Sequence, residues 1–381
     1  MIVTPSEESI ASNHDCRAAL ARSFQGVRWS MTRCSQGLRV LCGALFLAGL
    51  LAGCEQAEDP RVLVLRGSTM GTNYSVQIVE PSAALDRDAL AEQINARLAD
   101  ITTLMSTYQP GSELSRFNNA DVTEWFLVSP ELEAVVEAAQ AVSEASAGAF
   151  DVTVGPLVNL WGFGPSPRIE DLPSAGDIQA ARARVGWRQL EVQAQPPALR
   201  KSRPDLYVDL SAIAKGYAVD QLAGLVESHG IVDYLVEIGG ELRGRGVNGH
   251  GEPWRIAIER PDAGQRAVFQ VVALRDLGMA TSGDYRNFVE IDGQRYSHTI
   301  DPATGRPVGH RLASVTVLAD DCMQADAWAT ALLVLGPERG LALAEQRGLA
   351  ALFIEHAREA ADGDAFVTQA TAAFGALSVS H

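Results

Sequence analysis

The chain has 381 residues, a hydrophobic fraction of 47% and a formal net charge of −16 at pH 7. The acidic balance disfavours nucleic-acid binding but leaves room for an anionic ligand at a local site, and a mean hydropathy near zero argues against a multi-span membrane protein. Four of the five cysteines lie within the first 54 residues, which excludes a disulfide framework or zinc-ligand spacing in the folded part.

A short apolar run at residues 40–53 follows Arg33 and Arg39 and ends in Leu51-Ala52-Gly53-Cys54. The run is too short to span a bilayer comfortably, and its positive flank and small residues are typical of a secretory signal. The ending resembles a lipobox, which predicts that Cys54 is the lipidated first residue of the mature protein. A short buried helix with an incidental cysteine is the alternative.

The residues before Met31 are polar and unlike the start of a signal peptide. We therefore expect translation to begin at Met31, with a signal peptide at 31–53, a tether at 54–60 and one domain at 61–381. Sequencing the N-terminus of a precursor trapped before cleavage tests this expectation, and a precursor beginning at Met1 would contradict it.

The first half of the domain predicts strands and two helices. Strands are expected at 61–66 and around Tyr74, Val76 and Ile78, where apolar and polar residues alternate. A long helix should bury Leu90, Ile94, Leu98, Ile101 and Met105 on one face. A second helix should begin at Ser129-Pro130 and close at Gly148.

The second half mixes strands and helices without regular alternation. We expect a buried strand at 206–210 and a helix capped by Ser211 that runs to about His229 and stops at Gly230. Further strands are expected at 234–238, 254–259, 268–274, 288–291, 295–300 and 313–319, with a hairpin turn at Asp292-Gly293 and a helix at 325–335. The predicted class is α+β, with mixed, largely antiparallel sheets and packed helices in one compact unit or two lobes.

Asp326 and Thr330 are four residues apart and share a helix face. Both offer oxygen, which suits a hard cation such as Mg²⁺. Alone, this spacing is more often that of a solvated face or a cap.

His298 and Asp301 lie at the end of a strand that leads into a tight turn. Histidine can move a proton near neutral pH. The alternative is structural, with Asp301 bonding to backbone amides ahead of Pro302.

The segment 209–217 runs from an expected strand into a helix N-terminus, where free amides favour a phosphate, although the glycine pattern of a Walker loop is missing. On this segment alone, an ordinary strand-to-helix turn is the better explanation. Gly239-Gly240, Gly278 and Gly283 allow close approach of a ligand but serve common turns as well.

Together, these segments resemble one family, the FAD:protein FMN transferases, once described as thiamine-biosynthesis lipoproteins. The resembling stretches run in the family's order and cover nearly everything after residue 65: 69–72, 105–108, 112–118, 148–164, 209–220, 237–246, 281–283, 297–307 and 325–335.

The resemblance implies roles for particular residues. Those that fall where the family contacts FAD are Met70, Tyr108, Ala149, Phe150, Asp151, Asp209, Lys215 and Ile300. Magnesium would be bound by the carbonyl of Ala212 with Asp326 and Thr330, and His298 and Asp301 would lie beside the reacting phosphates. Some members carry a further Asp where this chain has Ala329, which puts the metal affinity in doubt.

The implied activity is Mg²⁺-dependent transfer of FMN from FAD to a threonine or serine hydroxyl of an acceptor protein, with release of AMP. The alternatives are hydrolysis of FAD to FMN and AMP, and flavin binding without catalysis. The family's acceptors are flavin-carrying subunits of membrane complexes such as sodium-pumping NADH:quinone reductase. Together with the lipid anchor, they suggest attachment to the inner membrane on its periplasmic side.

Overall fold

The computed structural model describes residues 2–3, 61–165, 171–261, 267–284, 288–291, 294–357 and 366–377. The predicted signal, Met31, Cys54 and the tether lie outside these residues. No helix in the described ranges has the length and apolar character needed to cross a membrane.

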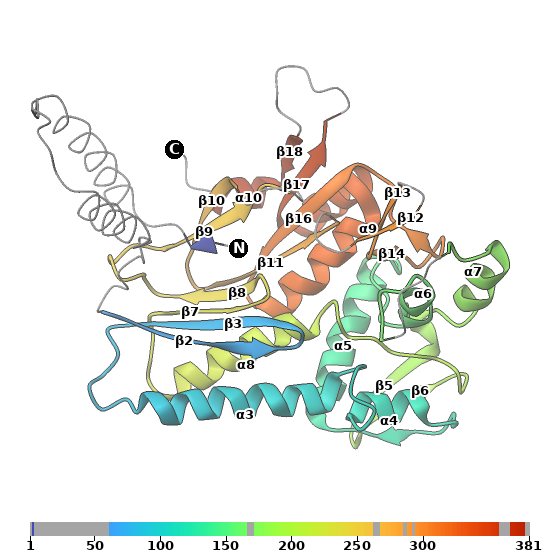
Figure 1. Ribbon diagram of the computed structural model, residues 1–381, viewed down its shortest axis with the longest axis horizontal. Helices are drawn as coiled ribbons and strands as arrows, with labels where there is room; N and C mark the ends of the chain where they lie inside the picture. Colours follow the sequence, from blue (N-terminus) through green and yellow to red (C-terminus); the bar gives the residue numbers. More distant parts are fainter. Residues whose placement is uncertain are drawn as a thin grey trace, which may run out of the picture.

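An eight-stranded antiparallel sheet forms the centre of the fold, in the order β18-β17-β16-β11-β8-β7-β3-β2 (Figure 1). Its strands are β2 (Val62–Thr69), β3 (Thr72–Val79), β7 (Tyr234–Ile238), β8 (Glu241–Arg245), β11 (Leu277–Gly283), β16 (Leu312–Ala319), β17 (Ala350–His356) and β18 (Phe366–Ala370). This arrangement confirms the α+β class with largely antiparallel sheets.

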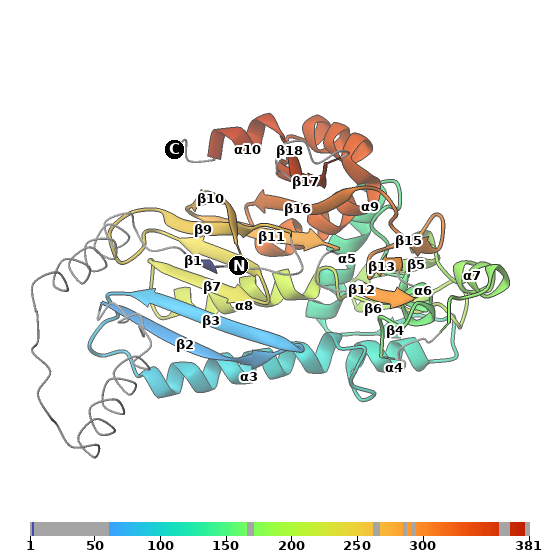
Figure 2. The ribbon, with the colours of Figure 1, turned by 45° about the horizontal axis from the view of Figure 1, so that its top comes forward.

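Helices α3 (Arg87–Met105), α5 (Pro130–Ala145), α8 (Ala214–Ser228) and α9 (Cys322–Arg347) share the main core with one face of the sheet (Figure 2). The opposite face packs against a sheet of β1 (Ile2–Val3), β9 (Trp254–Glu259) and β10 (Val268–Leu274), and against α10 (Ala372–Leu377). Successive side chains along a strand point to opposite faces of the sheet, so Val236 packs into one core and Leu235 into the other.

Smaller elements surround one end of the sheet. They are α4 (Glu113–Asn119), α6 (Gly155–Leu160), α7 (Ala175–Arg182) and a 3-10 turn (Trp187–Gln189). The short strands are β4 (Phe126–Leu127), β5 (Leu190–Ala194), β6 (Pro197–Lys201), β12 (Phe288–Ile291), β13 (Gln294–Ser297), β14 (Ile300–Asp301) and β15 (Arg306–Pro307). A small third core joins α6, α7 and β14, and the indole N–H of Trp161 donates to the Gly305 carbonyl at 2.9 Å.

The helix starts follow the expected capping chemistry in part. Ser129 caps α5 by accepting from the Leu132 amide, with Pro130 in the first turn, and α3 buries the five predicted residues. Ser211 does not cap α8, which begins three residues later. Its amide and hydroxyl instead donate to Asp209 Oδ1.

Two strand predictions need correction. Leu206, Val208 and Leu210 are buried, but the segment 206–210 forms no strand. The side chain of Asn118 bonds to both the amide and the carbonyl of Val208, in the place of a neighbouring strand. The expected strand 295–300 is interrupted at His298-Thr299, between β13 and β14. The predicted turn Asp292-Gly293 lies outside the described residues, and its flanking strands pair antiparallel.

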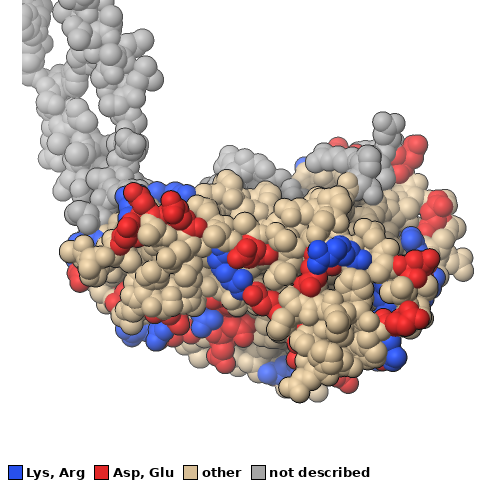
Figure 3. All heavy atoms as spheres, turned by 90° about the horizontal axis from the view of Figure 1, so that it is seen from below, with Lys and Arg blue, Asp and Glu red and all other residues tan. Residues whose placement is uncertain are grey.

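Acidic and basic side chains are interspersed on the face shown in Figure 3. The negative net charge is therefore not gathered into one patch on that face.

Candidate active site

A cavity of about 1170 Å³ lies where the hairpin tips of the main sheet, the loop after α3, helix α9 and the β12–β14 segment meet. Its volume is at the upper end of ligand pockets, which suits a dinucleotide-sized molecule. The predicted site residues on its wall are Met70, Tyr108, Ala149, Phe150, Asp151, Asp209, Ala212, Lys215, His298, Ile300, Asp326 and Thr330. Asp301 is not on the wall.

Two tight hairpin turns lie side by side at the cavity. Met70-Gly71 joins β2 to β3, and Gly239-Gly240 joins β7 to β8. All four residues have positive φ, as two-residue hairpin turns require. The turns are joined because β3 pairs with β7 and the Gly239 amide donates to the Asn73 carbonyl at 3.0 Å. At the glycines of these two turns, the backbone itself therefore lines the cavity.

An ion cluster lies on the wall next to the Gly239-Gly240 turn, because Glu241 follows that turn directly. Lys215 Nζ lies 2.7 Å from Glu241 Oε1 and 3.8 Å from Asp326 Oδ1. Burial lowers the pKa of Lys215, but Asp326 and Glu241 outweigh it and leave the pKa above its usual value. Burial, opposed by Lys215 and reinforced by Asp326, raises the pKa of Glu241 to about 7. Two carboxylates thus converge on the cavity with a single lysine between them.

The start of α8 leaves a carbonyl available beside this cluster. The Gly216 amide donates to Asp326 Oδ2 at 3.0 Å instead of to the carbonyl four residues earlier. No described residue donates to that carbonyl, which belongs to Ala212. On α9, the Thr330 hydroxyl is 3.0 Å from the Ser282 hydroxyl of β11. The Asp326 carboxylate, the Thr330 hydroxyl and the Ala212 carbonyl therefore belong to residues that line the same cavity.

The first turn of α9 is fixed from outside the helix. Asp220 of α8 accepts the Cys322 amide at 3.0 Å and the Met323 amide at 2.9 Å, and Arg243 donates to it at 2.8 Å. A Cβ at Gly278 of β11 would lie 2.4 Å from the Cys322 nitrogen, so α9 packs directly on the strand backbone. These contacts set the position of Asp326, one turn further on.

His298 and Asp301 have different surroundings. The His298 ring lines the cavity and meets Phe163 edge to face at 6.3 Å between centroids. Asp301 Oδ1 accepts the Ala303 amide at 2.8 Å, and the Asp301 carbonyl accepts the Gly305 amide at 2.8 Å. The structural alternative for Asp301, a turn held by its carboxylate, describes this geometry.

Two other predicted contact residues also hold local backbone. Asp151 accepts from the Thr153 amide and hydroxyl with one oxygen and from the Trp187 amide with the other. Burial raises the pKa of Asp151, although these hydrogen bonds oppose the rise. Asp209 holds the Ser211 turn. Both carboxylates shape the cavity wall through these turns.

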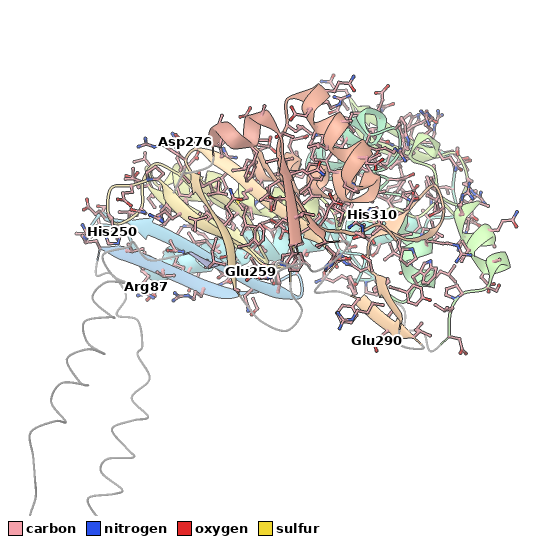
Figure 4. The ribbon with its side chains drawn as sticks, turned by 90° about the horizontal axis from the view of Figure 1, so that it is seen from above. Arg87, His250, Glu259, Asp276, Glu290 and His310 are labelled. Carbon is pink, nitrogen blue, oxygen red and sulfur yellow. The ribbon has the colours of Figure 1, made fainter. Side chains whose placement is uncertain are left out.

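Sequence reasoning missed Glu241 as a site residue, although the turn Gly239-Gly240 immediately before it could have drawn attention to it. It also missed Glu259 at the end of β9, which lines the cavity and is seen in Figure 4. Tyr108 is 64% exposed on the wall and offers an open aromatic face. The β12–β13 ribbon contributes Phe288 and Val289 to the wall and carries Glu290 away from the sheet (Figure 4).

Comparisons with known proteins agree on one family. The sequence model of the ApbE family matches residues 70–353. The FAD:protein FMN transferase of Vibrio cholerae serotype O1 is 48% identical over 305 residues, which cover 80% of this chain and 90% of that protein. The FAD:protein FMN transferase of Escherichia coli K12 is 43% identical over 351 residues, 90% of this chain and 97% of that protein.

Solved structures show the same likeness. The flavin transferase ApbE from Vibrio cholerae superposes with a TM-score of 0.76 at 45% identity, covering 83% of this chain and 99% of that one. The apo form of the Pseudomonas stutzeri flavinyl transferase ApbE superposes with a TM-score of 0.74 at 42% identity, covering 83% of this chain and 96% of that one.

Proposed function

The chain belongs to the ApbE family and is a flavin transferase that moves FMN from FAD to protein, and we propose how its cavity carries out the transfer. The observation that carries the proposal is the meeting of Lys215, Asp326, Thr330 and His298 on one cavity wall. FAD would lie in this cavity with its diphosphate against α8 and α9. The open face of Tyr108 is suited to stacking on a flat ring of the ligand.

The oxygen atoms around Asp326 fit a magnesium ion. Mg²⁺ prefers carboxylate and neutral oxygen ligands, and the Asp326 carboxylate, the Thr330 hydroxyl and the Ala212 carbonyl would provide them. Glu241 Oε2 is buried and has no hydrogen-bond partner among the described residues, so it is a further oxygen whose interactions a nearby cation would satisfy. When bound, the ion would offset the charge of the diphosphate. Ala329 is buried in the main core and is not on the cavity wall.

The remaining chemistry falls to side chains of the chain. His298 would accept the proton of the acceptor's threonine or serine hydroxyl. The oxygen then forms a bond to the FMN phosphorus, the bond from that phosphorus to the bridging oxygen breaks, and AMP leaves with that oxygen. Lys215 would sit beside the diphosphate and favour the charge that builds up on it. Asp301 would act through the turn that supports His298.

Incubation with FAD, Mg²⁺ and an acceptor tests this scheme. We expect an acceptor mass increased by FMN and an equal amount of AMP, measured by mass spectrometry and chromatography. The soluble domain of a flavin-carrying subunit from a sodium-pumping NADH:quinone reductase is a suitable acceptor. Free FMN with an unmodified acceptor would instead indicate hydrolysis, and unchanged FAD would indicate binding alone.

The proposal extends to location. A lipid on Cys54 would hold the domain on the periplasmic side of the inner membrane, where such acceptor subunits are found. The motif before Cys54 supports this placement. Metabolic labelling with a fatty acid, compared with a Cys54→Ser variant, tests it, since only the wild-type chain should carry label.

A further inference from the structure

A second cavity of about 570 Å³ adjoins the first. Its wall comes from the turn after α5, the last turn of α7, the segment 185–186 and the turn 302–303. Asp151 and Pro302 line both cavities. We propose that this second cavity, called here the acceptor groove, binds the segment of the acceptor protein that carries the hydroxyl; this rests on the proposed function.

The partition between the two cavities is built from fixed groups. Both carboxylate oxygens of Asp151 bond to the chain at 153 and 187, and Pro302 lies in the turn held by Asp301 and Gly305. A ligand in the groove therefore meets a wall of constant shape. That wall is also the edge of the FAD cavity.

The residue assigned to the proton, His298, lines the first cavity close in sequence to Pro302, which lines both cavities. His298 lies four residues before Pro302, so their Cα atoms are within about 14 Å of each other. An extended peptide covers that distance with about four residues. A segment lying in the groove can thus place its hydroxyl at His298 while its flanking residues stay outside the FAD cavity.

The chemistry of the groove selects the segment. Arg182 is exposed, and no described carboxylate forms an ion pair with it. The other charged side chain on the wall, Asp151, already bonds to backbone amides. The neighbouring wall residues Ala147, Gly148, Ala183 and Ala303 are small and leave room for a peptide backbone. The groove therefore suits an extended segment with an acidic side chain near its serine or threonine.

Charge reversal at Arg182 tests the proposal. The acceptor would be the soluble NADH:quinone reductase subunit domain, assayed at saturating FAD and Mg²⁺. Arg182→Glu should raise the KM for the acceptor by roughly tenfold or more, because a favourable charge pair becomes a repulsive one. The affinity for FAD, measured by flavin fluorescence, should not change. Arg188→Glu is the matched control, since Arg188 is also exposed but stacks on Trp187 and does not line the groove.

Filling the groove provides a second test that does not depend on charge. Ala183 is exposed on the wall, and Ala183→Trp should also raise the acceptor KM without changing FAD affinity. Equal acceptor KM values for Arg182→Glu, Ala183→Trp and the wild type would overturn the groove while leaving the transfer reaction in place. A wild-type protein that binds FAD but modifies no acceptor would overturn the proposed function, and the groove with it.

Discussion

Asp326 is held on both carboxylate oxygens by elements other than its own helix. One oxygen accepts the Gly216 amide, and the other faces Lys215. Asp326→Asn should keep the hydrogen bond and the shape but remove the charge that a cation needs. We expect transfer to fall by on the order of 100-fold and its dependence on Mg²⁺ to shift to higher concentrations.

A magnesium titration of the initial rate measures this effect, and an unchanged thermal unfolding midpoint shows that the fold is retained. Wild-type rates at every magnesium concentration would rule out Asp326 as a ligand.

His298 and Asp301 can be separated by substitution. His298→Ala should lower kcat by about 100-fold to 10,000-fold, as expected for loss of a proton acceptor. Asp301→Asn keeps an oxygen for the Ala303 amide and should stay within a few-fold of the wild type. Single-turnover measurements of AMP release across pH compare the two. A larger loss in Asp301→Asn than in His298→Ala would reverse these roles.

At the residue scale, the sequence predicted which side chains lie at the site better than it predicted which groups they interact with. Twelve of the predicted residues line the cavity. They could be identified from the sequence because the family resemblance assigns them by motif. The sequence did not identify Glu241 as a site residue, because its role depends on Lys215 and Asp326, which come close to it only in the folded structure. Asp301 was grouped with His298 by proximity in sequence, whereas its carboxylate turns back to the local backbone.

Among the elements, α9 depends on Asp220 for its position. Asp220→Ala would leave the Cys322 and Met323 amides and Arg243 without their acceptor. The magnesium concentration for half-maximal rate should rise by roughly 10-fold or more, because the helix that carries the proposed ligands Asp326 and Thr330 loses its anchor. Glu227→Gln is the control, since it weakens an ion pair with Arg245 near the far end of α8.

Comparable destabilisation in the two variants, with a magnesium shift only in Asp220→Ala, would support a positioning role. A shift of equal size in Glu227→Gln would indicate a general loss of stability instead.

Helices α3, α5 and α8 are joined by Arg97, Glu131 and Tyr217. Arg97 and Tyr217 both donate to Glu131, and the hydrogen bond from Arg97 is the main cause of the lowered pKa of Glu131. A carboxyl with a lower pKa in the folded state stabilises the fold above its unfolded pKa, and this contribution is lost as pH falls through the folded value.

The unfolding midpoint of Glu131→Gln should therefore lie below that of the wild type at pH 7, and the gap should narrow below about pH 4.3. Thermal melts between pH 7 and pH 3 measure it. Glu191→Gln, which removes a more exposed pair with Arg200, should show a smaller gap at pH 7. A gap for Glu131→Gln that is constant over the whole range would contradict the prediction.

Element prediction succeeded where local signals and packing agreed. The five buried positions of α3 follow from helical periodicity alone. Residues 206–210 show the limit, because their alternation is that of a strand but the partner is the side chain of Asn118, 90 positions away from Val208. The periodicity of apolar residues predicts which residues are buried. It does not predict which groups form hydrogen bonds with the backbone, because those partners are set by the tertiary fold.

Over the whole molecule, the cavity proposed to bind FAD lies between the central sheet and the small core around α6 and α7. A ligand that binds only the folded state stabilises it in proportion to the logarithm of its concentration. At 100 times the dissociation constant, FAD with Mg²⁺ should add about 2.7 kcal/mol, which raises the unfolding midpoint by several degrees.

Differential scanning fluorimetry, read through tryptophan emission, checks this shift. Asp326→Asn should lose the part of the shift that needs Mg²⁺ while keeping the part due to FAD alone. Identical shifts with and without Mg²⁺ in the wild type would show that the ion does not contribute to binding.

The cavity wall extends along the chain from Met70 to Val334, and both side chains of the proposed cation site, Asp326 and Thr330, lie on α9. A nascent polypeptide that ends before residue 326 lacks them, however well its earlier strands have paired. On the proposed assignment, a chain terminated before residue 326 would lack both side-chain ligands of the ion and could not hold FAD together with Mg²⁺.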